Sequence, residues 1–243
     1  KRDYTRHPAG FYAPMAAIPK IPRSEWADRI KEIEQSGAGL ADLHRARKIP
    51  VLNQKQTNYC WCFGTTKAVM MAYCRLGGKV PYLSAASVAA KVTNYNNRGS
   101  WAGEALEGFQ KYGASTVDFW PEAAIDRRYD TAEQQANAAL HKVVKFCELP
   151  SKQFDAIASA LLLGFPVTLG LDWWSHLVCG LQLRIKDGQF YVEFVNSWGT
   201  TYENEGFALL TESKATAYEA VMVQSVLDAY DAVKNRGHEV IAA

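Results

Sequence analysis

Residues 54–63 read Gln-Lys-Gln-Thr-Asn-Tyr-Cys-Trp-Cys-Phe, and an almost wholly apolar run continues from them to Arg75. The length of this run favours a buried helix over residues 58–75 rather than a strand. Asn58 is the expected N-cap, which places Cys60 in the first turn of the helix. Because the positive end of a helix dipole favours a thiolate, Cys60 is a candidate nucleophile.

Two segments further along the chain carry the groups that such a nucleophile needs. They are Ser-His-Leu-Val at residues 175–178 and Asn-Ser-Trp-Gly-Thr at residues 196–200. With Gln54 and Cys60 ahead of them, the polar groups follow the order Gln, Cys, His, Asn. In these segments the chain resembles the papain family of cysteine peptidases, and the similarity extends over roughly residues 40–222.

The resemblance implies a role for each of these residues. Cys60 would be the nucleophile, held as a thiolate by the imidazolium of His176, which would later protonate the leaving amine. Asn196 would orient the imidazole, and Trp198 would cover the Asn–His contact from water. The side chain of Gln54 and the backbone N–H of Cys60 would form the oxyanion hole.

The resemblance also places Gly99 and Ser100 where the family binds the substrate backbone. It assigns a disulfide to the positions of Thr57 and Asn97, so both ends of that bridge are missing from this chain. The cysteine count is five, an odd number that excludes complete intramolecular pairing. We therefore expect a reducing compartment, such as the cytoplasm. Cys62 lies about 200° round the helix from Cys60 and is expected to point into the core.

The expected fold class is α+β, a papain-like arrangement of a helical lobe and an antiparallel β lobe with the cleft between them. We divide the chain into an N-terminal extension (1–39), a peptidase domain (40–222) and a C-terminal helix and tail (223–243). The helical lobe covers about 58–125, and the β lobe covers about 40–57 and 126–222. Other helices are expected over 24–35 (capped by Ser24 and ended by Gly37), 84–90, 102–112, 131–146, 152–163 and 225–234. Strands are expected over 167–171, 177–185 and 190–195.

The proposed chemistry restricts the register of the last two strands. Asp187-Gly188 predicts a two-residue hairpin turn between them. Uninterrupted pairing from that turn would put His176 and Asn196 on opposite faces of the sheet, because side chains alternate along a strand. We therefore predict an odd-length connection or a β-bulge, with a kink at Gly180 as one suitable place.

Composition and charge limit the classes of partner that the chain can have. Lys and Arg number 27 against 25 Asp and Glu, a balance that argues against nucleic acid or anionic lipid as a partner. The sequence has no run long and apolar enough to span a membrane. No metal or organic cofactor is needed, and no CxxC or CxxH pair suggests a zinc site. The sequence does not indicate an oligomeric state.

The leading hypothesis is a cysteine endopeptidase acting on a peptide or protein, and it admits self-processing as a further reaction. Two rivals stay open: acyl transfer or peptide ligation at the same site, and a non-enzymatic protein-interaction module. The proline-rich arm over residues 1–23 either packs as a structural extension or lies across the cleft. The remaining histidines are expected at the surface: His7, His44, His141 and His238.

Overall fold

The structure is a computed structural model that describes residues 10–227. Its α-helices are α1 (Arg23–Ser36), α2 (Leu40–Ala46), α3 (Cys60–Arg75), α4 (Ala85–Val92), α5 (Ala102–Lys111), α6 (Ala132–Ala138), α7 (Phe154–Leu162) and α8 (Glu212–Ala215). Its strands are β1 (Val143–Glu148), β2 (Val167–Leu171), β3 (His176–Lys186), β4 (Gln189–Val195), β5 (Phe207–Thr211) and β6 (Glu219–Val226). A short 3₁₀ helix spans Arg127–Tyr129.

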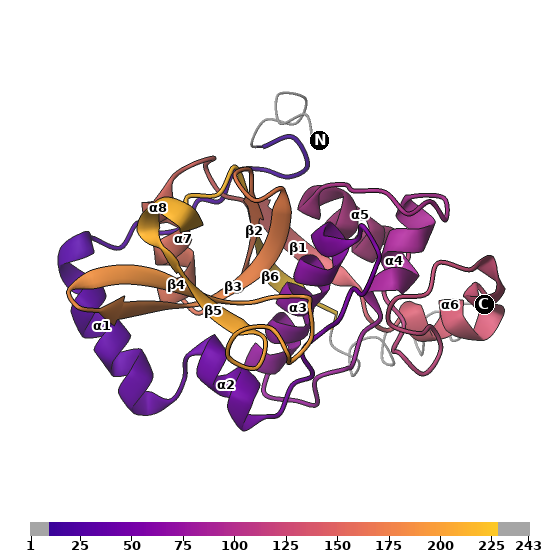
Figure 1. Cartoon of the computed structure of the whole chain (residues 1–243), viewed down its shortest axis with the longest axis horizontal. Helices are drawn as coiled ribbons and strands as arrows, with labels where there is room; N and C mark the ends of the chain where they lie inside the picture. Colours follow the sequence, from indigo (N-terminus) through magenta and orange to yellow (C-terminus); the bar gives the residue numbers. More distant parts are fainter. Residues whose placement is uncertain (1–9, 228–243) are drawn as a thin grey trace, which may run out of the picture.

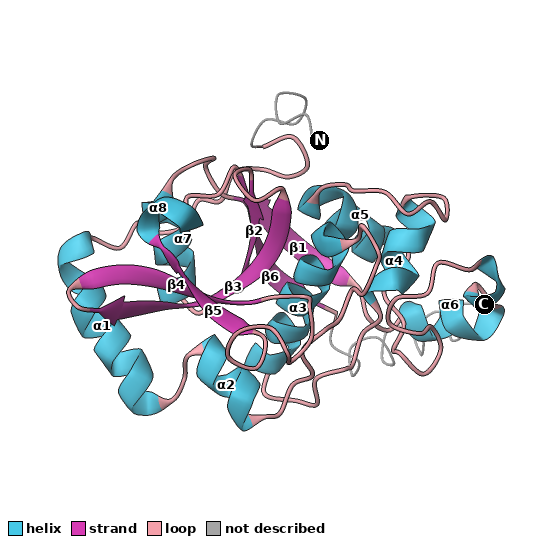
Figure 2. Ribbon diagram, viewed as in Figure 1, coloured by secondary structure: helices cyan, strands magenta, loops and turns pink. Residues whose placement is uncertain are grey.

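Helix α3 lies at the centre of the molecule, between the sheet and helices α4 to α6 (Figures 1 and 2). The strands form one antiparallel sheet in the order β1-β6-β2-β3-β4-β5. Every residue of α3 from Cys60 to Cys74 is buried, as the almost wholly apolar run predicted. The described helices and strands confirm the α+β class.

Strand β3 divides the core in two, because its side chains alternate between the faces of the sheet. Leu177 and Cys179 belong to the core around α3, whereas Val178 belongs to the core around α1 and α7. The strand therefore has no solvated face over this stretch, and all of its residues from His176 to Leu183 are buried.

The β3–β4 hairpin confirms the predicted change of register. Lys186 pairs with Gln189 across a two-residue turn, and the pairing shifts between Gly180 and Gln182. Leu181 is thus one extra residue in β3, a β-bulge beside the predicted kink at Gly180. Because of this bulge, His176 and Asn196 share a face of the sheet.

Two expected helices are wrong in part. The helix expected over residues 131–146 ends at Ala138, and β1 begins at Val143, where β-branched and aromatic residues pair with β6. The helix expected from Ser225 begins inside β6, which was not predicted, and residues 228–234 lie outside the described part. The division of the chain at residues 39 and 222 remains a prediction.

The expected N-caps of two helices also need correction. Pro22 rather than Ser24 is the N-cap of α1, although Gly37 ends that helix in the left-handed region as expected, at φ 64°. Tyr59 rather than Asn58 precedes α3, because the Asn58 side chain hydrogen-bonds elsewhere.

His44 is buried, not at the surface, since the unpredicted helix α2 packs it against α3 and Phe207. His141 is half-buried, and its Nδ1 lies 3.0 Å from the carbonyl oxygen of Ala114. His7 and His238 lie outside the described residues.

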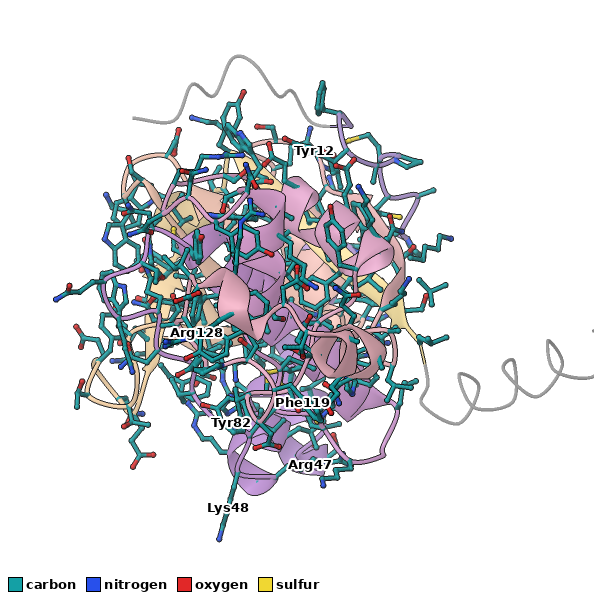
Figure 3. All side chains as sticks on the ribbon, turned by 90° about the vertical axis from the view of Figure 1, so that its right-hand side faces the viewer. Tyr12, Arg47, Lys48, Tyr82, Phe119 and Arg128 are labelled. Carbon is teal, nitrogen blue, oxygen red and sulfur yellow. The ribbon has the colours of Figure 1, made fainter. Side chains whose placement is uncertain are left out.

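The N-terminal segment is fastened to the end of β1. The buried carboxylate of Glu148 accepts hydrogen bonds from the backbone N–H groups of Tyr12, at 2.6 Å, and Ala13, at 3.0 Å. Figure 3 shows Tyr12 at one end of the molecule, with Arg47 and Lys48 at the other. Within residues 10–227, no helix combines the length and apolar character that a membrane span requires.

Candidate active site

Cys60 is the first residue of α3 and is 9% exposed, so its sulfur lies at the edge of the core. Gly64, one turn further along, lets the helix approach β3 closely. A Cβ at Gly64 would lie 2.5 Å from the Leu177 side chain and 3.2 Å from the Val178 backbone. This close packing brings the start of α3 and the start of β3, which carries His176, to the same place.

Cys62 points into the core, which confirms its predicted direction. It is fully buried, and its thiol donates to the carbonyl oxygen of Ala85 at 3.2 Å. Burial raises the pKa of Cys62 to about 12. Its thiolate is therefore nearly absent at neutral pH, and Cys62 cannot replace Cys60 as a nucleophile.

His176 and Asn196 are in direct contact. His176 Nε2 lies 2.7 Å from Asn196 Oδ1, and both residues are buried. An amide oxygen only accepts, so Nε2 carries the proton and donates it to this bond. Nδ1 is then the nitrogen that can exchange a proton with a thiol. The same Asn196 oxygen also accepts the backbone N–H of Ser197 at 2.8 Å.

Two tryptophans enclose the imidazole. The ring centroids of Trp174 and Trp198 each lie 4.8 Å from that of His176. Trp174 is half-buried and also meets Trp198 edge to face at 5.4 Å. Both rings therefore contact the imidazole that makes the His–Asn hydrogen bond. Trp173 stacks on the outer side of Trp174 and is exposed.

Gln54 lies in a loop that pairs with the segment after β4. Its backbone N–H donates to the Ser197 carbonyl oxygen at 2.8 Å, and its side-chain oxygen accepts from the Ser197 hydroxyl at 2.6 Å. Its Nε2 donates to the Thr57 carbonyl oxygen at 2.8 Å. An amide nitrogen has two N–H groups, so one is left for a ligand.

The segment that carries Gly99 and Ser100 is tied to the start of α3. Trp61 Nε1 donates to the carbonyl oxygen of Arg98 at 3.2 Å. At Gly99 an added Cβ would meet nothing, so the backbone is open there. The Ser100 hydroxyl turns inward and donates to Glu104 in the first turn of α5. The serine side chain therefore leaves this part of the surface clear.

Asn97 occupies one predicted end of the missing disulfide and makes hydrogen bonds instead. Its Oδ1 accepts the Asn58 N–H at 2.6 Å, and its carbonyl oxygen accepts from the Asn58 amide at 3.1 Å. These bonds join the loop before α3 to the segment before Gly99. All five cysteines lie in the described region, and none forms a disulfide.

The described end of the N-terminal arm reaches α5. Tyr12 lies over Gly103, where an added Cβ would come within 2.1 Å of the ring. The Gly103 N–H donates to the carboxylate of Glu219 at 3.2 Å, which links the helices to the sheet. Tyr12, Trp101 and Glu219 line one small hollow. The prediction that the arm lies across the cleft concerns residues 1–9 as well, and these lie outside the described residues.

Comparison with known proteins adds an independent observation to this geometry. The family model described as "Papain family cysteine protease" matches residues 42–179, more than half of the chain. The chain belongs to the papain family. The match begins in α2 and ends in β3, so it includes Cys60 and His176.

Curated members of the papain family show the same relation at low identity. The chain is 25% identical over 192 residues to cathepsin K of Mus musculus, covering 69% of this chain and 57% of that protein. It is also 25% identical over 192 residues to a cathepsin L-like peptidase of Aedes aegypti, covering 68% of this chain and 56% of that protein. The chain thus spans little more than half the length of these relatives.

Solved structures share the papain-family fold. Digestive procathepsin L 3 of the Tenebrio molitor larval midgut superposes with a TM-score of 0.63 and 21% identity, covering 72% of this chain and 66% of that one. Recombinant stem bromelain precursor gives a TM-score of 0.65 and 16% identity, covering 89% of this chain and 76% of that one.

Two charged residues near the Gln54 loop, buried Lys67 and half-buried Glu122, were not predicted. Lys67 lies in the middle of α3 and is 2% exposed, among apolar neighbours. Glu122 receives the backbone N–H of Asn53 at 3.0 Å. A lysine inside the largely apolar run 60–74 was the one available signal.

Among residues 10–227, no three His, Cys, Asp or Glu side chains are gathered as they are around a metal ion.

Proposed function

We propose that this chain hydrolyses peptide bonds of peptide or protein substrates, with Cys60 as the nucleophile and His176 as its proton partner. The observation that carries the proposal is the 2.7 Å contact between His176 Nε2 and Asn196 Oδ1. That contact fixes the tautomer, orients the ring and leaves Nδ1 for the thiol. Because Asn196 is neutral, the positive charge stays on the imidazolium and stabilises the thiolate.

The reaction proceeds in two halves. The Cys60 thiolate attacks the carbonyl carbon, and the carbonyl π electrons move onto oxygen. As the oxyanion collapses, the C–N bond breaks and the imidazolium of His176 gives its proton to the leaving amine. Neutral His176 then takes a proton from water, which attacks the thioester. The carboxylic acid product leaves, and the thiolate–imidazolium pair is restored.

Two N–H donors are proposed for the oxyanion. One is the Gln54 Nε2 hydrogen not used by Thr57, and the other is the backbone N–H of Cys60. Support for Gln54 comes from its three hydrogen bonds to Ser197 and Thr57, which hold the amide in one orientation. Donors fixed in this way stabilise the developing charge without reorganising. Gly99, and less directly Ser100, would receive the substrate backbone, and Trp198 would shield the His–Asn bond.

We also propose that the protein works in a reducing compartment. Hydrogen bonds between Asn58 and Asn97 join the two segments for which the family resemblance implies a disulfide. Oxidation is therefore not needed to hold these segments together. Full activity in excess reductant, with no change in thermal stability, is the expected result.

The test compares the wild-type chain with Cys60→Ala on casein and on fluorogenic peptide amides. Peptide hydrolysis that needs Cys60 supports the proposal. Adding an amine nucleophile separates hydrolysis from acyl transfer, because a transferase yields mainly the amide product. An intact chain with no Cys60-dependent turnover on any peptide would favour a non-enzymatic interaction module instead.

A further inference from the structure

A buried lysine supports the loop that carries Gln54 from behind. Lys67 lies two turns after Cys60 on α3, and its ammonium group donates to the carbonyl oxygen of Pro50. It also lies 3.1 Å from His44 Nε2, on α2. With 2% of its surface exposed, Lys67 is one of the few charged residues in the core.

The ionisation of this cluster is set by burial. Desolvation lowers the pKa of Lys67 to about 7, against the smaller opposing effects of Cys179 and Glu122. Burial and the positive charges of Lys67 and Arg45 lower the pKa of His44, which is therefore neutral. Protonated Lys67 has no acceptor, so in that form His44 Nε2 accepts from it and His44 carries its own proton on Nδ1. The ammonium group thus has two acceptors, on α2 and in the loop.

The carbonyl oxygen of Pro50 receives its hydrogen bond from a side chain. Proline has no N–H, so the chain cannot continue a regular ladder of hydrogen bonds through this residue. Beyond Pro50 the loop is held residue by residue: Leu52 accepts the Gly199 N–H at 3.1 Å, and Asn53 donates to Glu122 at 3.0 Å. Lys67 and Glu122 therefore hold the two ends of the segment from Pro50 to Asn53, directly before Gln54.

Burying an ammonium group costs several kcal/mol, and an apolar residue of similar volume is often no less stable there. Stability therefore does not explain Lys67. We propose that Lys67 is a positioning residue of the oxyanion hole, which holds the backbone of residues 50–54 so that the Gln54 amide stays in place. This inference rests on the proposed function, because it assigns a purpose to the support of Gln54.

The test uses Lys67→Met, which keeps the length of the side chain and removes its hydrogen bonds. Misplacing an oxyanion donor weakens transition-state binding more than substrate binding. We expect kcat to fall about tenfold, with KM within about twofold of wild type. The inhibition constant of a peptide aldehyde, whose adduct carries an oxyanion, should rise by the same factor. Alkylation of Cys60 by iodoacetamide, which develops no oxyanion, should keep its rate.

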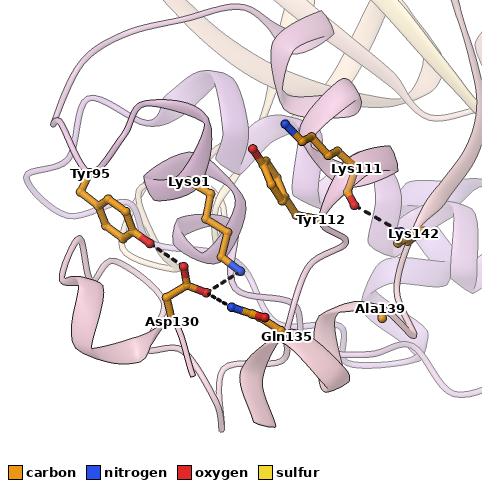
Figure 4. Close-up of a pocket in the computed structure, with 8 residues that line it drawn as sticks. All are labelled: Lys91, Tyr95, Lys111, Tyr112, Asp130, Gln135, Ala139 and Lys142. Carbon is orange, nitrogen blue, oxygen red and sulfur yellow. Dashed lines mark hydrogen bonds and ion pairs between the residues drawn. The ribbon is translucent and has the colours of Figure 1, made fainter. Parts of the chain in front are cut away.

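A second lysine, half-buried, provides the control. Lys91 in α4 has a side chain that is 9% exposed and pairs with Asp130 at 2.9 Å (Figure 4). Lys91 also donates to the side-chain oxygen of Gln134 at 2.8 Å. Neither Asp130 nor Gln134 belongs to the Gln54 loop. Lys91→Met also replaces the ammonium group of a hydrogen-bonded lysine, and we expect it to leave kcat and aldehyde inhibition unchanged.

Two more variants keep the inference falsifiable if Lys67→Met does not fold. Lys67→Gln keeps an N–H donor and should retain more of the rate than Lys67→Met. Glu122→Leu removes the acceptor of the Asn53 N–H, at the other end of this segment. It should also lower kcat and leave the rate of Cys60 alkylation unchanged.

A Lys67→Met enzyme with wild-type kcat would overturn the inference. So would a loss of rate that Lys91→Met reproduces. A wild-type chain that neither hydrolyses peptides nor reacts at Cys60 would instead refute the proposed function, so the two failures are distinguishable.

Discussion

The two sides of the candidate active site, named here the strand wall and the loop wall, differ in the interactions that hold them. The strand wall, formed by His176, Asn196 and Trp198, takes its geometry from the β3–β4 register and the bulge at Leu181. The loop wall, formed by residues 50–58 and 97–101, has backbone hydrogen bonds to Ser197 and Gly199 and is otherwise held largely by side chains that hydrogen-bond to its backbone.

In the loop wall, Lys67 binds the carbonyl oxygen of Pro50, Glu122 binds the N–H of Asn53, and Asn97 binds the N–H of Asn58. A register is all or none, because one residue more or less reverses every side chain. A side-chain hydrogen bond, by contrast, can be removed by one substitution while the others stay in place. We therefore expect changes in the strand wall to abolish or strongly reduce the chemistry, and changes in the loop wall to tune it.

The largest expected effect comes from the residue between the walls. Cys60→Ala should lower kcat/KM by about 10³-fold or more, because no other nucleophile is in reach. Cys62 is fully buried with a pKa raised to about 12, so it should not compensate. The melting temperature should stay close to that of the wild type. Substantial activity in this variant would assign the nucleophile elsewhere.

Asn196→Ala tests the strand wall itself. The change removes the acceptor 2.7 Å from His176 Nε2 and leaves a buried N–H without a partner. We expect kcat/KM to fall by about 10- to 100-fold, since the ring loses its orientation and its preferred tautomer. Steady-state kinetics on a peptide amide measure the loss. An unchanged rate would show that the register of β3 is not needed to orient the histidine.

Asn97→Ala makes the corresponding change in the loop wall. It removes the side-chain oxygen that accepts the Asn58 N–H at 2.6 Å. Since this segment precedes Gly99, we expect KM to rise by about two- to fivefold while kcat stays the same. If Asn97→Ala lowered kcat as much as Asn196→Ala does, the distinction between the walls would be lost.

The last comparison concerns the free energy of unfolding rather than the rate. The pKa of Lys67 is about 7 in the folded chain, below its ordinary value of 10.5. Between these pH values the unfolded chain binds more protons, so this group makes the free energy of unfolding rise with pH. Urea unfolding at about pH 7 and about pH 9.5 should show this rise in wild type relative to Lys67→Met. Parallel pH dependences of the two proteins would contradict the burial of the ammonium group.

The sequence predicts the strand wall better than the loop wall, for a physical reason. The β3–β4 hairpin has a local signature in Asp187-Gly188, and the need for His176 and Asn196 to share a face required the bulge. By contrast, the contacts of Lys67 with Pro50 and of Asn97 with Asn58 join residues far apart in sequence. Such contacts leave no periodic pattern.

The errors in secondary structure arise in the same way. No Gly or Pro marks the end of α6, so the expected helix ran on into β1. The partner of β1 is β6, a strand near the other end of the sequence, and it was not predicted. Tertiary pairing therefore overrode the local pattern at Val143. His44 was placed at the surface because α2, the short helix that buries it, was not predicted.

The central claim is that Cys60 is a thiolate paired with the imidazolium of His176, and the pH dependence of probe labelling tests it most directly. A peptide epoxide or vinyl sulfone is reacted with the wild-type chain across the pH range, and the modified residue is identified by peptide mapping. The account predicts modification at Cys60 alone, with a rate that rises to a plateau as the ion pair forms and falls as the imidazolium loses its proton. A rate that rises steadily up to about pH 10, or modification at Cys62, would contradict it.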